Sequence, residues 1–160
     1  MSSDEDPPCP LCRTPCPKSA EEELAKLRRN VENGNPVAVS QLGQDYEHGE
    51  LGLVPSHKKA ARLYQRAADL GDVSAMYNLG FCYRNGEGVK LDKKKAVKYY
   101  RMAADRGNAN AQFNLGYYFD KGDGVAQDYA EAFRFYKLAA DQGFTEAEFN
   151  LGCMHGTARG

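Results

Sequence analysis

The chain has 160 residues, of which 21 are basic and 22 are acidic, so its formal net charge is -1. This near-neutral balance gives no reason to expect a nucleic acid or an anionic membrane as the partner. Hydrophobic residues make up 42% of the chain, which is typical of a soluble folded protein, and the apolar runs are too short to span a membrane.

The N-terminal segment indicates where the protein works. Met1 to Pro8 is acidic and lacks the apolar stretch of a signal peptide. Three of the five cysteines, Cys9, Cys12 and Cys16, follow closely, and an odd cysteine count does not indicate a disulfide framework. We therefore expect an intracellular protein, cytoplasmic or nuclear, with reduced thiols.

The pair Cys9 and Cys12, with Pro10 between them, resembles the last two zinc ligands of a RING-type domain. Two thiolates at this spacing can share one tetrahedral zinc ion. Cys16 is a candidate third ligand, and His48 or His57 a candidate fourth. Because only the pair matches, two interpretations of residues 1–18 remain open: a disordered acidic tail, or the remainder of a RING domain, which we favour. We expect no cofactor, with zinc bound only if the RING-like segment is complete.

Residues 19–34 have the pattern of a helix that covers the start of a repeat array. Ser19 and Glu22 have the spacing of a capping box. The apolar positions that follow share one helical face: Leu24, Leu27 and Val31.

From residue 35 onward the sequence repeats itself. Asn-Leu-Gly begins at Asn78, Asn114 and Asn150, each 36 residues after the last, and Gln41 begins a related copy 37 residues before Asn78. Ala-Ala-Asp has the same period, and so do single tyrosines at positions 64, 100 and 136. The extra residue of the first copy lies in the loop Gly49–Gly52. A fixed period of this length predicts stacked units of secondary structure.

Each unit has the pattern of two helices. In the second unit the first helix ends at Asn85-Gly86 and the second begins after Asp92. In the third unit, Asp128 and Glu131 have the spacing of a capping box. Since one helix pair cannot bury its apolar face alone, we expect an all-α, right-handed α/α solenoid of antiparallel helix pairs. It spans residues 35–152, with three full repeats and the first helix of a fourth, and residues 153–160 are expected to be irregular.

These residues resemble the Sel-one-like repeat family, which is related to the tetratricopeptide repeats. The shared landmarks are Ala-Xaa-Xaa-Asn-Leu-Gly, Gly-Xaa-Gly-Val, Ala-Xaa-Xaa-Xaa-Tyr and Ala-Ala-Asp-Xaa-Gly, which residues 75–107 carry in full. The resemblance implies a non-catalytic scaffold that brings other proteins together, and no catalytic motif appears elsewhere in the sequence. The alternative is the substrate-recognition part of a RING-type ubiquitin ligase whose zinc domain is truncated here.

A partner segment is expected on the concave face, which the first helix of each unit lines. The predicted binding residues are Tyr77, Asn78 and Phe81 in the second unit and Phe113, Asn114 and Tyr117 in the third. Their amides can bond a peptide backbone, and their rings can form anchor pockets. The alternative is structural: the asparagines bond the adjacent helix, and the aromatics belong to the core. A basic stripe on the second helices, including Lys94 and Lys137, is expected to be a solvated outer face.

Overall fold

The computed structural model describes the backbone of residues 17–157 and the side chains of residues 19–154. Within these residues the chain forms eight α-helices and no strand. They are α1 (Pro17–Glu32), α2 (Pro36–His48), α3 (His57–Asp69), α4 (Val73–Asn85), α5 (Lys93–Ala104), α6 (Ala109–Lys121), α7 (Tyr129–Ala140) and α8 (Thr145–Thr157). A short 3-10 helix, Glu50–Gly52, lies in the loop that carries the extra residue.

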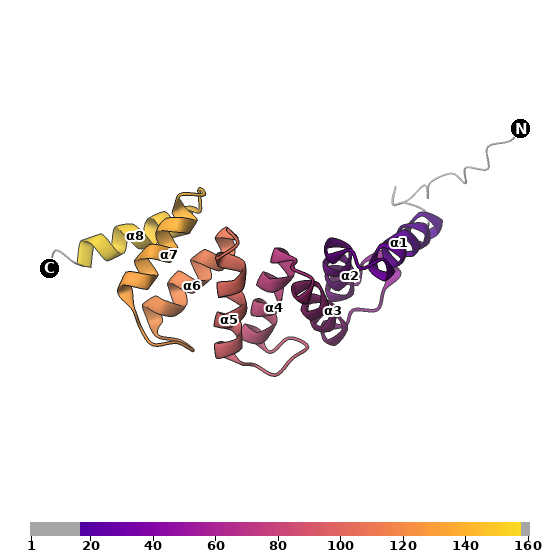
Figure 1. Ribbon diagram of the computed structural model, residues 1–160, viewed down its shortest axis with the longest axis horizontal. Helices are drawn as coiled ribbons and strands as arrows, with labels where there is room; N and C mark the ends of the chain where they lie inside the picture. Colours follow the sequence, from indigo (N-terminus) through magenta and orange to yellow (C-terminus); the bar gives the residue numbers. More distant parts are fainter. Residues whose placement is uncertain (1–16, 158–160) are drawn as a thin grey trace, which may run out of the picture.

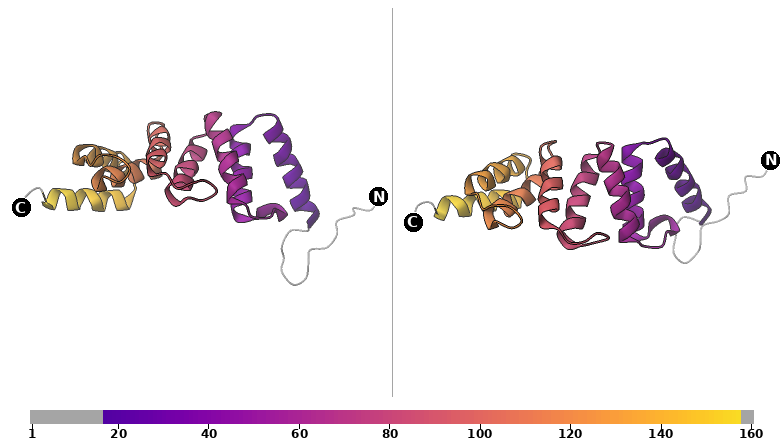
Figure 2. Two further views of the ribbon diagram at one scale, coloured as in Figure 1. Left: turned by 90° about the horizontal axis from the view of Figure 1, so that it is seen from below. Right: turned by 60° about the horizontal axis from the view of Figure 1, so that its bottom comes forward.

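The helices pack as consecutive pairs in chain order. α2 packs with α3, α4 with α5 and α6 with α7, while each pair contacts the next. The pairs follow one another along the long axis, with α1 at one end and α8 at the other (Figure 1). Two further views show the same order (Figure 2). The predicted all-α solenoid of helix pairs is therefore confirmed. None of the helices in the described residues is long and apolar enough to cross a membrane.

Local signals in the sequence set the helix ends. The side chains of Asn35, Asp72 and Asn108 cap α2, α4 and α6 by accepting a hydrogen bond from the amide three residues later. These three helices end at glycines in the left-handed conformation, with φ of 74° at Gly49 and 75° at Gly86. The start of α5 after Asp92 and the end of α4 at Asn85 are as predicted.

Each helix pair is held together by one tyrosine lying on one glycine. Tyr100 of α5 is fully buried, and a Cβ atom added to Gly80 of α4 would lie 2.8 Å from its ring. Tyr136 lies on Gly116 in the same way, at 2.6 Å. A glycine at these positions therefore lets the two helices of a pair approach closely.

Three local predictions are wrong. α1 begins at Pro17, which suits a first helical turn, so Ser19 lies inside the helix and is not its cap. Asp128 does cap α7, but Glu131 binds Arg134 at 3.0 Å and completes no capping box. Residues 153–157, expected to be irregular, continue α8, since the single Gly156 among them weakens a helix without ending it.

Burial makes the fold sensitive to alkaline pH. It raises the pKa of the phenols of Tyr64, Tyr100, Tyr118 and Tyr136, and it raises the pKa of the Cys82 thiol to about 12. In the unfolded chain these groups ionise near their ordinary values of about 8.5 for the thiol and about 10 for the phenols. The unfolded state then binds fewer protons than the folded state, so stability falls as pH rises.

We therefore expect the urea midpoint of unfolding to stay level between pH 7 and pH 8 and to fall steadily between roughly pH 9 and pH 11. The measurement is urea denaturation followed by circular dichroism at each pH. Phenolate absorbance should show that part of the tyrosines ionises only as the chain unfolds. A midpoint that stays level up to pH 11 would contradict the burial of these groups.

Candidate functional site

The three residues predicted on α4 are all half-buried. The ring of Tyr77 packs against the core, with its centroid 5.7 Å from that of Tyr100. The ring of Phe81 lies under the guanidinium of Arg84, at 5.5 Å. Asn78 lies between them in the sequence. Tyr77 is therefore partly a packing residue, whereas Phe81 and Asn78 contribute to the surface.

The three residues predicted on α6 line one hollow of about 510 Å³. Phe113 and Asn114 are half-buried, and Tyr117 is 48% exposed. Phe113 also stacks on Phe144, with ring centroids 4.8 Å apart, so it joins its own unit to the next. The hollow is completed by Arg84, Asn85, Lys93, Tyr118 and Asp123. The structure thus brings Phe113, Asn114 and Tyr117 together with the charged end of the preceding unit.

The amides of Asn78 and Asn114 make no hydrogen bond to any part of the chain that the structure describes. The structural alternative required both amides to bond the adjacent helix, and that bond is missing in this region. Asn150 begins the third Asn-Leu-Gly copy. Burial and the charge of Asp120 raise the pKa of Tyr136 to about 12, and the nearby side chain of Asn150 lowers it.

A second hollow, of about 520 Å³, lies between α6 and α8 and is lined by Phe113, Thr145, Glu146, Phe149 and Asn150. Phe149 is 72% exposed. Phe149 was not among the predicted binding residues, although the repeat period indicates it, because residues 77, 113 and 149 are spaced by 36.

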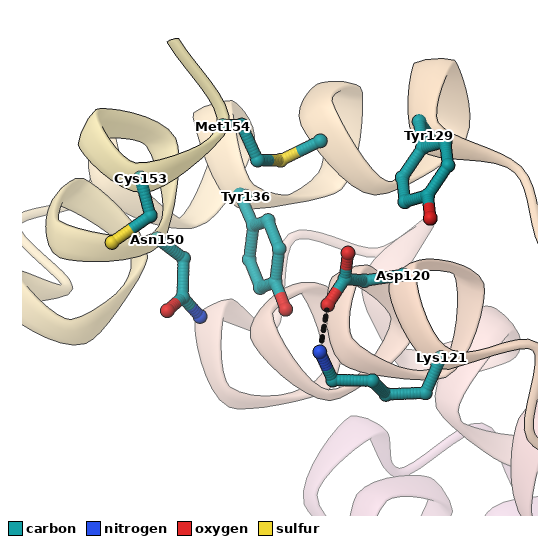
Figure 3. Close-up of a pocket in the computed structure, with 7 residues that line it drawn as sticks. All are labelled: Asp120, Lys121, Tyr129, Tyr136, Asn150, Cys153 and Met154. Atoms are coloured by element: carbon teal, nitrogen blue, oxygen red, sulfur yellow. Dashed lines mark ion pairs between the residues drawn. The ribbon is translucent and has the colours of Figure 1, made fainter. Parts of the chain in front are cut away.

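A third hollow, of about 590 Å³, lies where α6, α7 and α8 meet (Figure 3). Asn150, Cys153 and Met154 come from α8, and Tyr129 and Tyr136 come from α7. The remaining two residues, Asp120 and Lys121, form an ion pair of 2.7 Å at the end of α6 (Figure 3). The hydrogen bond to Asp120 raises the pKa of Lys121. The lining therefore combines aromatic surface with one charge of each sign.

The predicted zinc ligands Cys9 and Cys12, together with Cys16, lie outside the described residues. Among the residues that the structure does describe, one group of possible metal ligands lies together, formed by Glu47, His57 and Glu87. It is separate from the three hollows, none of which these residues line.

The repeat geometry matches a known sequence family. The sequence model of the Sel1 repeat matches residues 36–72, 73–108, 109–144 and 145–160, which is most of the chain. The chain belongs to the Sel1 repeat family. The boundaries of the matches coincide with the helix pairs α2–α3, α4–α5 and α6–α7, and the last match covers α8. No curated protein matches the chain significantly.

Solved structures share this Sel1 fold. One is c5321, a protective antigen present in uropathogenic Escherichia coli strains, with 36% identity and a TM-score of 0.83 over 87% of this chain and 30% of that one. A Sel1 repeat protein from Oxalobacter formigenes has 32% identity and a TM-score of 0.79 over 85% and 56%. Cysteine-rich protein B of Helicobacter pylori, with 22% identity and a TM-score of 0.63 over 83% and 95%, shares the fold.

The chain spans about a third and about half of the first two of these structures. Sel1 repeat proteins are generally scaffolds for protein interaction, mostly without enzymatic activity, and no catalytic family is among the matches. Nothing in the comparisons supports the RING-like interpretation of the N-terminal segment or the ubiquitin-ligase alternative.

Proposed function

We propose that this Sel1 chain is a non-catalytic adaptor that binds an extended segment of a partner protein along the first helices of its units, from the end of α4 to α8. The observation that carries the proposal is that the three hollows adjoin. Phe113 lines both the first and the second, and Asn150 lines both the second and the third. A row of shallow hollows suits several consecutive side chains of one extended segment better than a single small molecule.

Exposed aromatic side chains along this row are suited to anchor the partner. Phe149 is 72% exposed and Tyr117 is 48% exposed, although most large apolar residues of the units are buried. Aromatic residues carry much of the binding energy of protein interfaces, because they bury a large area with few rotatable bonds. We therefore expect the partner segment to present at least one large apolar side chain.

The polar groups of the row add a second requirement. Asn114 lines the first hollow, and Asn78, which lines none of the three, occupies the equivalent position one unit earlier. Each offers an unbonded amide, which can donate to and accept from a peptide backbone. Arg84 makes no ion pair with any residue that the structure describes, and it lines the first hollow beside Asn114. A guanidinium in this position binds a carboxylate with two parallel hydrogen bonds. The expected partner segment is thus extended and carries an acidic residue near its apolar anchor.

Replacing Asn78 and Asn114 with alanine together is expected to weaken binding of such a peptide roughly tenfold, since each amide contributes about 0.5–1.5 kcal/mol to the complex. Helicity and melting temperature should stay unchanged, because neither amide bonds the rest of the described chain. The measurement compares peptides enriched from a display library on the wild-type chain with their affinities for the double variant.

The matched control is the double variant Lys94→Ala with Lys137→Ala, which removes two exposed side chains of the second helices. It should bind the enriched peptides as tightly as the wild type does. If instead the asparagine variant unfolds at a lower temperature, the amides have a structural role. Unchanged affinity in a stable asparagine variant would place the binding surface elsewhere.

A further inference from the structure

Three side chains from three elements meet at the corner between the first and second repeat units. None of the three lines a hollow described above. Glu47 lies at the end of α2, His57 is the first residue of α3, and Glu87 lies in the loop after α4. Their possible ligand atoms all lie within 4.8 Å of one another. The loop is fixed here, because a Cβ atom on Gly88 would overlap the backbone carbonyl of His57. The corner is thus formed by backbone packing as well as by side chains.

Neighbouring groups orient both carboxylates. The hydroxyl of Tyr64 donates a hydrogen bond of 2.5 Å to Oε2 of Glu47, and Nδ2 of Asn85 donates one of 3.2 Å to Oε1 of Glu87. Each carboxylate keeps one oxygen that is not used in these bonds. The imidazole of His57 forms no hydrogen bond or ion pair with the described residues. The hydrogen bonds from Tyr64 and Asn85 orient the two carboxylates, as outer-shell partners do around metal ligands.

The equivalent corner between the second and third units has the opposite charge balance. Arg84, Lys93 and Asp123 take the places of Glu47, His57 and Glu87 in the repeat. There Lys93 binds Asp123 directly at 2.8 Å, and Gly124 lies against Lys93 as Gly88 lies against His57. The second corner therefore contains its own cation, whereas the first brings two carboxylates together without one.

We propose that Glu47, His57 and Glu87 bind one divalent transition-metal ion of the zinc class, which joins the first repeat unit to the second. An imidazole nitrogen with two carboxylate oxygens suits Zn²⁺, with water as the fourth ligand, better than it suits Mg²⁺ or Ca²⁺. Ligand atoms around tetrahedral zinc lie about 3.4 Å apart, so atoms that are now up to 4.8 Å apart must approach by up to about 1.4 Å. His57 is exposed and both glutamates are only half-buried, which leaves them room to rotate. This inference is independent of the proposed peptide binding.

The test is calorimetric titration of the full chain with ZnCl₂, in a background where Cys9, Cys12 and Cys16 are replaced by serine so that tail thiolates do not compete. We expect one zinc ion per chain and a higher melting temperature with zinc. His57→Ala should lower the association constant by more than about tenfold and abolish the thermal shift. His48→Ala removes an exposed histidine next to Glu47 that bonds the Gln44 carbonyl, and it should leave both unchanged.

A second variant separates metal binding from folding. His57→Lys recreates the Lys93–Asp123 arrangement, so it should melt without zinc at least as high as the parent chain while binding no zinc. Cobalt(II) should bind without a thiolate charge-transfer band, because no cysteine belongs to the ligand set. Zinc binding that survives His57→Ala, equal binding of Mg²⁺, or a thiolate band would overturn the proposal.

Discussion

Replacing Tyr100 with alanine is expected to lower the free energy of unfolding by about 3–5 kcal/mol, as is usual for a large buried ring. Tyr100 is fully buried on Gly80, and its ring contacts those of Tyr77 and Tyr118, with centroids 5.7 Å and 5.9 Å away. Its removal is expected to leave a cavity between the second and third units, which the ring now packs together. The measurement is urea denaturation of the wild type and the variant at pH 7.

The conservative variant Tyr100→Phe gives the control. Among the described residues the Tyr100 hydroxyl has no hydrogen-bond partner, so its removal should leave stability unchanged or raise it by up to about 1 kcal/mol. Tyr64→Phe is the opposite case, because it removes a bond to the Glu47 carboxylate and should lower stability by about 1.5 kcal/mol. A Tyr100→Phe variant that loses as much stability as Tyr100→Ala would contradict this description of the core.

Replacing Gly116 with valine is expected to lower the free energy of unfolding by about 3 kcal/mol, because the added side chain must displace a buried ring. A Cβ atom there would lie 2.6–2.9 Å from three ring atoms of Tyr136. Tyr136 is only 2% exposed and cannot move away without disturbing the packing of α6 on α7. Thermal or urea denaturation would measure the loss.

Gly152 offers a matched control within the same chain. It occupies the same position of the repeat as Gly116, but nothing lies within 4 Å of a Cβ atom built on it. Gly152→Val should therefore change stability by less than about 0.5 kcal/mol. Equal losses at the two glycines would mean that valine acts through helix propensity and not through the tyrosine contact.

Periodic residues allowed the fold to be predicted from the sequence. Gly116 and Tyr136 recur 36 residues after Gly80 and Tyr100, and the structure shows that each pair makes the same contact. The wrong prediction for the start of α1 arose where two helix-start signals, a proline and a serine, lie close together. At the start of α1, a proline favoured an earlier helix start than the serine did.

The candidate site was only partly predictable, because a helical pattern gives the face of a helix but not its neighbours. Phe113 was expected to line a groove, and it does, but its stacking on Phe144 depends on how the third unit meets the fourth. Glu47, His57 and Glu87 were not singled out together because they break the period. A search for repeated residues passes over positions where one unit differs from the next. This corner has two carboxylates, whereas the equivalent corner of the next unit has one carboxylate and two cations.

The most direct test of peptide binding on the first helices is to map where an enriched peptide binds. The isotopically labelled full chain would be titrated with the peptide, and the backbone amide chemical shifts would be followed by NMR. We expect the perturbed amides to cluster on α4, α6 and α8, around Asn78, Asn114 and Asn150. A cluster on the second helices, around Lys94 and Lys137, would contradict the proposed surface.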